Sequence, residues 1–349
     1  MNTRELLTIL SNSTGVSGHE YAFSSVIKQA FEEFCTSVYQ DATGNIIGIR
    51  KCKKEKTYKV MLAAHMDEIG LMVKDIDDRG FISFTNIGGV DSRILLAQEV
   101  IVHGKEDLFG IIGAKPPHLQ TEEESKKAVE IKDMAIDVGM DAKKVKELVS
   151  IGDIITFRSP TSCLLNNYLS GKSFDDRAGI ICIIECLKEL KNTDIDVDVY
   201  AVATVQEEVG LRGAIVSTYN IEPDIGIAID VCHGETPDAP KEDTHSTGKG
   251  PVVTIGPNIH PKLVKKMFSI ADEYNIPYQK DVEPGNTGTD AWAIQVTRSG
   301  IPTLLLSIPL RYMHTTVETL NFNDIVNTGK LLAFFIKNLK GDLEELLCY

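Results

Sequence analysis

The sequence predicts an α/β protein with a central sheet flanked by helices and a smaller β-rich unit inserted into it. Apolar, strand-like runs alternate with helical patterns up to residue 69 and again from residue 166. Between these stretches the alternation is lost, and several short strand-like runs follow one another directly. We therefore expect residues 1–69 and 166–349 to form one discontinuous domain, and residues 70–165 to form the β-rich insert.

The composition excludes several classes of protein. The 349 residues carry a net charge of −14, whereas a protein that binds nucleic-acid phosphates needs a basic face. The first residues show no basic segment followed by an apolar one, and the most apolar helical run, residues 178–187, is too short to span a bilayer. The seven cysteines are scattered and odd in number, which favours reduced thiols. We expect a cytoplasmic protein that binds neither nucleic acid nor membranes.

The expected elements follow from local patterns in chain order. The first part contains helices over 2–10 and 21–34, a hairpin of 37–41 and 45–49, and a strand over 58–64. The insert contains strands over 69–76, 81–87, 98–103, 108–112 and 154–157, with a short helix over 141–149. The last part contains buried strands over 196–206, 224–231, 251–255 and 301–308, with helices ending near Lys191 and spanning 261–274 and 323–339.

The apolar strands share one property, which is a histidine or a carboxylate close to the end of each. These residues are His65, Glu207 with Glu208, Asp230 and His314, while Asp175 stands at the start of a helix. Each has a common structural explanation by itself, such as a solvated strand end or a helix N-cap. Ligands of open α/β sheets bind at the carboxyl ends of the strands, where several acids together would repel one another unless cations neutralise them.

Two imidazoles and three carboxylates form a ligand set that suits a divalent metal such as zinc or cobalt. Two metals roughly 3.5–4 Å apart, bridged by one carboxylate, are a common device for hydrolysis. Adjacent strand residues point to opposite sides, so Glu207 and Glu208 can have different roles, one binding metal and the other moving protons. Asp67, two residues after His65, can fix the tautomer of that imidazole.

Seven segments resemble the M42 family of dinuclear metalloaminopeptidases, in the order that the family has them. They are His65-Met66-Asp67-Glu68-Ile69-Gly70, Gly110-Ile111-Ile112-Gly113-Ala114-Lys115-Pro116-Pro117-His118, Phe174-Asp175-Asp176-Arg177, Gln206-Glu207-Glu208-Val209-Gly210, Ile229-Asp230, Thr289-Asp290 and Met313-His314-Thr315-Thr316-Val317-Glu318. The likeness extends over nearly the whole chain. Each motif is weak alone, but their combination is specific.

The resemblance implies a role for each site residue. His65 and Asp230 would bind one metal, Glu208 and His314 the other, and Asp175 would bridge the two. Glu207 would be the general base and acid, and Asp67 would orient His65. The cofactors would be two divalent ions per subunit, zinc or cobalt, with manganese as a third candidate.

The resemblance also implies the architecture and the partners. The catalytic domain would have a mixed central sheet like that of other zinc peptidases, and the insert would be a PDZ-like dimerisation domain. The substrates would be short peptides, trimmed from the N-terminus, and the protein would form dimers and, as in many members of the family, tetrahedral dodecamers.

Other functions compete with this hypothesis. An amide metallohydrolase of another kind, such as a deacylase or a carboxypeptidase, would need the same metal chemistry. A glucanase using Glu207 and Glu208 as its acid pair is less attractive, because sequence neighbours on a strand diverge and do not face each other. A scaffold with a structural metal is the least attractive alternative. The preferred N-terminal residue of the substrate stays open.

Overall fold

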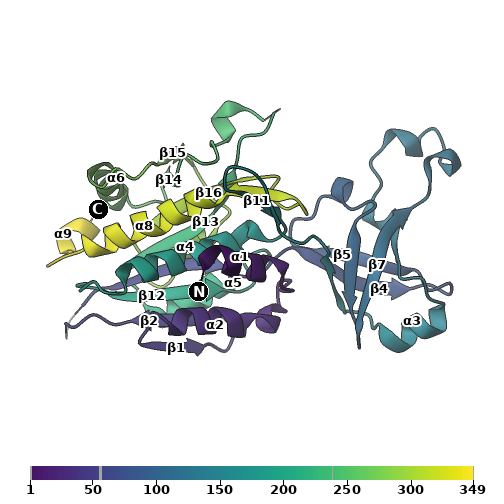
Figure 1. The fold of residues 1–349 in the computed structure, drawn as a ribbon, viewed down its shortest axis with the longest axis horizontal. Coiled ribbons are helices and arrows are strands. Elements are labelled where there is room, and N and C mark those ends of the chain that lie inside the picture. Colours follow the sequence, from purple (N-terminus) through teal and green to yellow (C-terminus); the bar gives the residue numbers. More distant parts are fainter. Residues whose placement is uncertain (1, 55–56, 238, 349) are drawn as a thin grey trace.

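A mixed sheet of eleven strands forms the centre of the larger domain in the computed structural model, which describes residues 2–54, 57–237 and 239–348 (Figure 1). Nine strands follow one another across the sheet: β1 (Ser37–Gln40), β2 (Ile46–Arg50), β12 (Asp198–Thr204), β3 (Lys59–His65), β13 (Ile225–His233), β16 (Thr303–Arg311), β17 (Glu318–Asn321), β11 (Tyr168–Gly171) and β10 (Ser162–Cys163). Two further strands, β14 (Val252–Ile255) and β15 (Gln279–Val282), extend it from β16.

The four central strands β12, β3, β13 and β16 are parallel, so their carboxyl ends lie at one edge of the sheet. Thr204 of β12 pairs with His65 of β3, and Ala228 of β13 pairs with Ala63 of β3. Asp230 lies two residues after Ala228, and His65 lies two residues after Ala63, so Asp230 and His65 are at the same height on adjacent strands. The register thus brings two of the candidate ligands close together.

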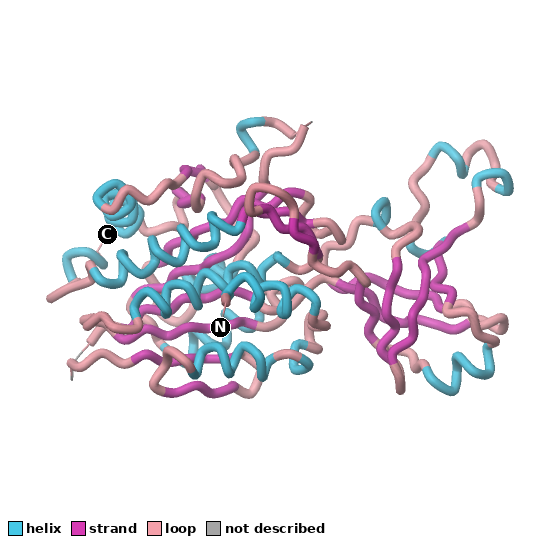
Figure 2. Tube along the Cα trace, viewed as in Figure 1, coloured by secondary structure: helices cyan, strands magenta, loops and turns pink. Residues whose placement is uncertain are grey.

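Helices cover both faces of this sheet (Figures 1 and 2). One face carries α1 (Thr3–Asn12), α4 (Phe174–Leu190) and α8 (Phe322–Lys337), and the other carries α5 (Arg212–Ile221) and α7 (Asp290–Val296). A Cβ added to Gly226 of β13 would lie 2.4 Å from Ile294 of α7, which shows how closely α7 approaches the sheet. The remaining helices, α2 (Ser24–Glu32), α6 (Pro261–Glu273) and α9 (Glu344–Leu347), pack around the outer strands and the C-terminal end.

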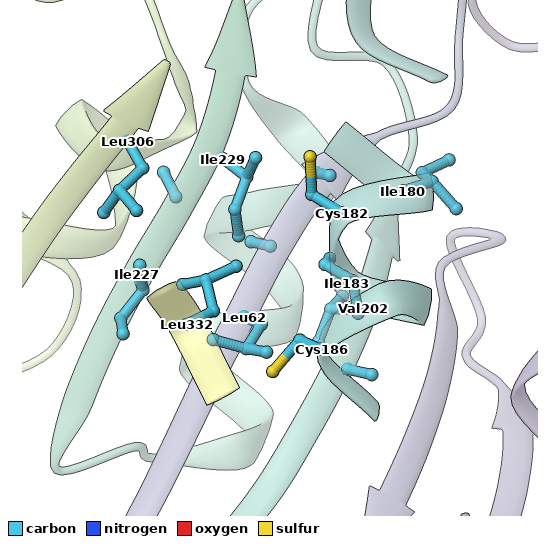
Figure 3. Packing of buried hydrophobic residues seen from close by; sticks show 14 of the residues in the cluster. Leu62, Ile180, Cys182, Ile183, Cys186, Val202, Ile227, Ile229, Leu306 and Leu332 are labelled. Carbon is cyan, nitrogen blue, oxygen red and sulfur yellow. The ribbon is translucent and has the colours of Figure 1, made fainter. Parts of the chain in front are cut away.

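The main hydrophobic core lies between the sheet and helices α4 and α8. Figure 3 shows Leu62, Val202, Ile227, Ile229 and Leu306 of the strands beside Cys182, Cys186 and Leu332 of the helices. The two cysteines share one face of α4, as their spacing of four residues predicts, and both are free thiols inside the core. Burial raises the pKa of both thiols, Cys182 and Cys186, above their usual range, so both stay uncharged and pack as apolar groups.

A closed six-stranded β-barrel stands beside the sheet domain (Figure 2). Its strands, in the order in which they pair, are β4 (Gly70–Ile76), β5 (Ile82–Ile87), β8 (Met134–Asp137), β7 (Asp107–Ala114), β6 (Glu99–His103) and β9 (Ile154–Phe157), and α3 (Ala142–Leu148) packs against it. The barrel has a hydrophobic core of its own. The expected fold class, a mixed α/β sheet domain with a small β-rich unit, is confirmed, whereas the exact domain boundaries stay a prediction.

Short 3₁₀ helices lie in the connections: η1 (Glu20–Ala22), η2 (Ser92–Ile94), η3 (Pro117–Leu119), η4 (Glu124–Lys126), η5 (Ile131–Asp133) and η6 (Lys241–Asp243). Strands β8, β15 and β17 were not expected from the sequence. Each has only four residues and lacks the run of apolar, largely β-branched residues that marks β9 and β14, which are equally short but were expected. Within the described residues, no helix is both long enough and apolar enough to cross a membrane.

Leu332→Ala tests the core between α8 and α4. Leu332 has no exposed surface, so we expect the truncation to lower the free energy of unfolding by about 2–5 kcal/mol, measured by urea denaturation. Leu165→Ala is the matched control, because Leu165 is 85% exposed at the tip of the β10–β11 hairpin and should change stability by less than about 0.5 kcal/mol. Equal losses in the two variants would contradict the assigned core.

Candidate metal centre

The carboxyl edge of the parallel strands gathers all five candidate ligands. His65 is the last residue of β3, and Asp230 lies in β13. Asp175 lies in the first turn of α4, after Ser173, whose φ of +60° turns the chain into the helix. The other two ligands, Glu208 and His314, follow the ends of β12 and β16 in loops. Three separate kinds of local structure therefore supply one site.

Asp175 stands between the two imidazoles. Its Oδ1 lies 3.0 Å from Nε2 of His65, and its Oδ2 lies 3.2 Å from Nε2 of His314. The same His314 nitrogen lies 3.2 Å from Oε1 of Glu208. Each oxygen of Asp175 thus faces a different histidine, which is the arrangement that a bridging carboxylate needs.

Two groups of three residues each offer ligand atoms within 4.8 Å of one another. One group is His65, Asp175 and Asp230, and the other is Asp175, Glu208 and His314. Asp175 is the member that the groups share. Nitrogen and oxygen donors in this number suit a borderline divalent cation. The residue set therefore fits divalent metal ions, and the five residues named from the sequence are all within the two groups.

The carboxylate of Asp67 organises the turn that carries the two glutamates. It accepts the backbone N–H of Glu207 at 3.0 Å and that of Glu208 at 3.2 Å, and the hydroxyl of Ser17 at 2.6 Å. The Nδ1 atom of His65 lies nearer to the backbone carbonyl of Asp67, at 3.1 Å, than to its carboxylate, at 3.6 Å. Asp67 therefore orients His65 through its main chain and positions Glu207 and Glu208 through its side chain.

The sequence suggested that Glu207 and Glu208 are neighbours on a strand, but the structure places both of them beyond its end. Strand β12 ends at Thr204, and Gln206 has a φ of +55°, which takes the chain out of the sheet before the glutamates. Their different directions come from this turn and from the contacts with Asp67. Gly210, with a φ of +123°, closes the turn by donating its N–H to the carbonyl of Glu207.

Glu318 is a buried residue of the centre for which no role was expected from the sequence. Its Oε2 accepts the backbone N–H groups of Phe174 and Asp175, at 2.7 and 3.2 Å, and its Oε1 accepts that of His314 at 3.1 Å. One carboxylate thus holds the backbone of two candidate ligands. The signal available in the sequence was its position, four residues after His314, within a quoted motif.

Asp176 has a structural task that separates it from Asp175. Its Oδ1 accepts the N–H of Gly179 in the first turn of α4, and its Oδ2 accepts the backbone N–H of His65 at 3.2 Å. Asp176 is therefore the capping carboxylate of the pair, and Asp175 is left to face the imidazoles.

A buried ion network supports the same corner. The carboxylate of Glu68 accepts hydrogen bonds from the Lys172 ammonium and from the N–H of Gly15, and it pairs with the Arg177 guanidinium, 3.3 Å away. All three charged groups are buried. Burial lowers the pKa of Lys172 and of Arg177 even though Glu68 raises both. Burial opposes the charged form of Glu68, but the two nearby cations lower its pKa below the usual value. The network ties the segment around Gly15 to the stretch that leads into Asp175.

The electrostatics of the centre favour a cation. Burial, followed by repulsion from Asp230 and Asp290, raises the pKa of Glu207 to about 10 despite the nearby imidazole of His65. Burial opposes the charged form of His314, but the carboxylates of Asp175 and Glu208 raise its pKa to about 11. Burial also raises the pKa of Asp230 well above its usual value. The carboxylates can all ionise only when positive charge is placed among them.

A cavity of about 1040 Å³ opens over the centre. His65, Asp175, Glu207, Glu208, Asp230 and His314 all line it. Glu207 belongs to neither three-residue group, yet its Oε2 lies 3.9 Å from Nε2 of His65. A carboxylate beside a metal-ligand set and facing a cavity is placed to exchange protons with a bound molecule.

Comparison with known proteins covers almost the whole chain. Residues 44–331 match the model of the M42 glutamyl aminopeptidase family. The chain is 37% identical to the lysyl aminopeptidase of Pyrococcus furiosus over 341 residues, which cover 96% of this chain and 97% of that protein. A TET aminopeptidase from a marine sediment archaeon of the Thaumarchaeota is 33% identical, with a TM-score of 0.93 and 99% of both chains covered.

A further solved structure is the TET1 peptidase of Pyrococcus horikoshii, which can assemble into a tetrahedron or a large octahedral shell. It is 34% identical, with a TM-score of 0.85, and the match covers 97% of this chain and 100% of that one. The similarity therefore includes the β-barrel as well as the sheet domain.

Glu318→Gln tests the support of the ligands. An amide places an N–H₂ group against at least one of the backbone N–H donors that Glu318 now accepts, so Asp175 or His314 must shift. We expect the affinity for Zn²⁺ or Co²⁺ to fall about 10–100-fold, measured by competition with a chelator. Glu106→Gln, on an exposed loop of the barrel, should leave the affinity unchanged. Unchanged affinity in both variants would contradict the role of Glu318.

Proposed function

Because the chain belongs to the M42 family of peptidases, we propose that it is a metal-dependent aminopeptidase that trims short peptides with two divalent cations per subunit. Membership makes it a hydrolase of peptide bonds and implies divalent metal ions. The observation that carries the finer proposal is Asp175, whose two oxygens face two different histidines at 3.0 and 3.2 Å. Zinc or cobalt suits this donor set, and manganese is a third candidate.

In this proposal each cation has its own ligands. His65 and Asp230 would hold one cation, Glu208 and His314 would hold the other, and Asp175 would be shared by both, in keeping with the two groups of nearby ligand atoms. When bound, the cations supply Lewis-acid polarisation of the scissile carbonyl and lower the pKa of a water molecule. Both histidines present Nε2 to the site, while each Nδ1 faces a backbone carbonyl that fixes the tautomer.

Glu207 is the proposed proton carrier. Its carboxylate takes a proton from the attacking water and delivers it to the nitrogen of the leaving peptide, so that the departing group leaves as a neutral amine. Asp67 keeps Glu207 in place by accepting its backbone N–H.

Assembly with copies of itself is part of the proposal. The Pyrococcus horikoshii relative forms closed shells, and its match includes the barrel of this chain. We propose that this chain forms dimers through the barrel and that the dimers build a tetrahedral dodecamer. A cytoplasmic location stays a prediction from the sequence.

Glu207→Gln tests the mechanism. The amide cannot accept the proton of water, so we expect kcat on unblocked aminoacyl-anilides to fall about 10²–10⁴-fold while bound metal, counted by elemental analysis, is unchanged. Glu147→Gln on exposed α3 is the control and should keep full activity. Full turnover by the Glu207 variant with its metals in place would refute the assignment.

An acetylated α-amine separates the proposed activity from that of a deacylase. An aminopeptidase should lose turnover on the blocked substrate, whereas a deacylase should cleave it. A carboxypeptidase is distinguished by a peptide amidated at its C-terminus, which an aminopeptidase should still trim.

The charge of the cavity indicates the preferred first residue of the substrate. Four carboxylates outside the metal centre line the cavity: Glu242, Asp243, Asp281 and Glu283. Among the lining residues that the structure describes, none is Lys or Arg. His245 also lines the cavity, with Nε2 3.4 Å from Asp281. We propose that substrates beginning with Lys or Arg are preferred, as the name of the Pyrococcus furiosus relative also suggests.

We expect kcat/KM for lysyl-anilide to exceed that for glutamyl-anilide by about tenfold or more, because the acidic cavity attracts one and repels the other. Asp281→Asn and Glu283→Gln should each lower this ratio about threefold, the size expected for one partly exposed charge pair. The leucyl-anilide rate serves as the internal control and should change little. A wild-type preference for glutamyl substrates would contradict the proposal.

A further inference from the structure

One loop of the barrel reaches into the metal centre. It follows β5 and contains Gly88, Gly89 and Val90. The carbonyl of Gly89 lies 3.0 Å from Nδ1 of His314, a residue 225 positions away in the chain. Gly89 also lines the cavity over the centre. The barrel therefore contributes a backbone group to a site whose ligands all come from the sheet domain.

The fit of this loop leaves no room for a side chain. A Cβ on Gly89 would lie 2.8 Å from Nδ1 and 3.0 Å from Cε1 of the His314 ring. A Cβ on Gly88 would lie 2.8 Å from Ile69 and 3.2 Å from Oε2 of Glu208, and its φ of +75° disfavours other residues. Two successive glycines thus let the main chain approach both His314 and Glu208.

The barrel itself sets the conformation of the loop. The side-chain amide of Asn86, at the end of β5, donates to the carbonyl of Gly88 at 2.8 Å, and the N–H of Val90 donates to the same oxygen at 3.1 Å. Ile87 pairs with Gly70, the first residue of β4. The loop therefore begins beside Gly70, the residue at which the chain enters the barrel and which lies two residues after Glu68.

A second contact from the barrel's exit holds the loop that carries His314. The hydroxyl of Ser159, two residues after β9, donates to the carbonyl of Thr316 at 2.5 Å. His314 and Tyr312 in that loop both have φ of +59°, a conformation that neighbouring contacts must maintain. The imidazole is thus held at its Nδ1 by Gly89 and through its loop by Ser159.

The other histidine has a different anchor. Nδ1 of His65 faces the carbonyl of Asp67 at 3.1 Å, two residues away on the same segment of the sheet domain. A carbonyl acceptor at Nδ1 fixes the tautomer that leaves Nε2 free to bind a cation. The two histidines therefore take the same kind of support from different parts of the molecule.

We propose that the 88–90 loop is a positioning element for the group of Asp175, Glu208 and His314. The affinity of this group for its cation then depends on the contact that the barrel makes with it through this loop. The group of His65, Asp175 and Asp230 does not have this dependence. The inference rests on the proposed two-cation centre. It makes the barrel part of the catalytic site and not only a surface for assembly.

Gly89→Ala is the direct test, with Gly113→Ala as its matched control. Gly113 lies in β7 of the same barrel, and a Cβ there meets nothing within 4 Å. Metal-free full-length protein is titrated with Zn²⁺ and with Co²⁺ by calorimetry, and the melting of the metal-free protein is recorded. In Gly89→Ala we expect one cation to bind as in the wild type and the second to bind about 10–100-fold more weakly, with melting like that of the control.

Ser159→Ala provides a second route to the same site without added bulk. Removal of its hydroxyl should lower the affinity of the Asp175, Glu208 and His314 group for its cation about 3–10-fold, as expected for one lost hydrogen bond. The affinity for the other cation should not change. Site-selective weakening in both variants supports the proposal. Two cations bound equally by the wild type and by both variants would overturn it. Fewer than two cations bound by the wild type would instead overturn the two-cation centre, and this inference with it.

Discussion

Buried carboxylates that accept backbone N–H groups hold the metal centre together. Asp67 accepts two such groups from the turn of Glu207 and Glu208, and Glu318 accepts three from the backbones of Phe174, Asp175 and His314. Apart from the contact between Glu318 and His314, each of these contacts joins segments that are far apart in the sequence. Asp175, Glu208 and His314 come from a helix start and from loops, which have no ladder of strand hydrogen bonds to keep them in place. The two carboxylates replace that ladder, so the geometry of the site depends on them.

The same chemistry makes the centre dependent on positive charge. Several acids lie together at low exposure, and burial with mutual repulsion keeps the pKa values of Glu207, Glu208 and Asp230 raised. Bound cations would remove this repulsion, so cation binding and loss of protons must be linked. The network of Glu68, Lys172 and Arg177 shows the alternative solution, in which buried acid and base neutralise each other directly. One cluster is closed by its own side chains, and the other is left open to a ligand.

The β-barrel has two relations to the sheet domain. It has its own core and its own closed set of strands, so it is a separate structural unit. Yet its Gly89 carbonyl and its Ser159 hydroxyl both support the segment of His314. A unit with its own core therefore contributes a backbone carbonyl and a hydroxyl to the support of a candidate ligand in the other domain.

The sequence by itself determined the fold class and the kinds of residue in the site. Apolar runs of strand length, alternating with helical periods, are local features, and the parallel strands that they form place their carboxyl ends at one edge. His65, Asp230 and the other candidate ligands could be named on this basis, because their distance from a strand end or helix start is also local. The resemblance to a family then added a role to each.

Only the tertiary structure decided how these residues are held. The turn at Gln206, with its positive φ, overrode the expectation that Glu207 and Glu208 alternate on a strand. The tasks of Asp67 and Glu318 depend on which N–H groups come within reach, and the contact of Gly89 with His314 spans 225 positions. A short strand such as β15, in which three of four residues are polar, carries too few apolar residues to be recognised. Local patterns report burial and periodicity, but a hydrogen bond between distant segments exists only once the chain has folded.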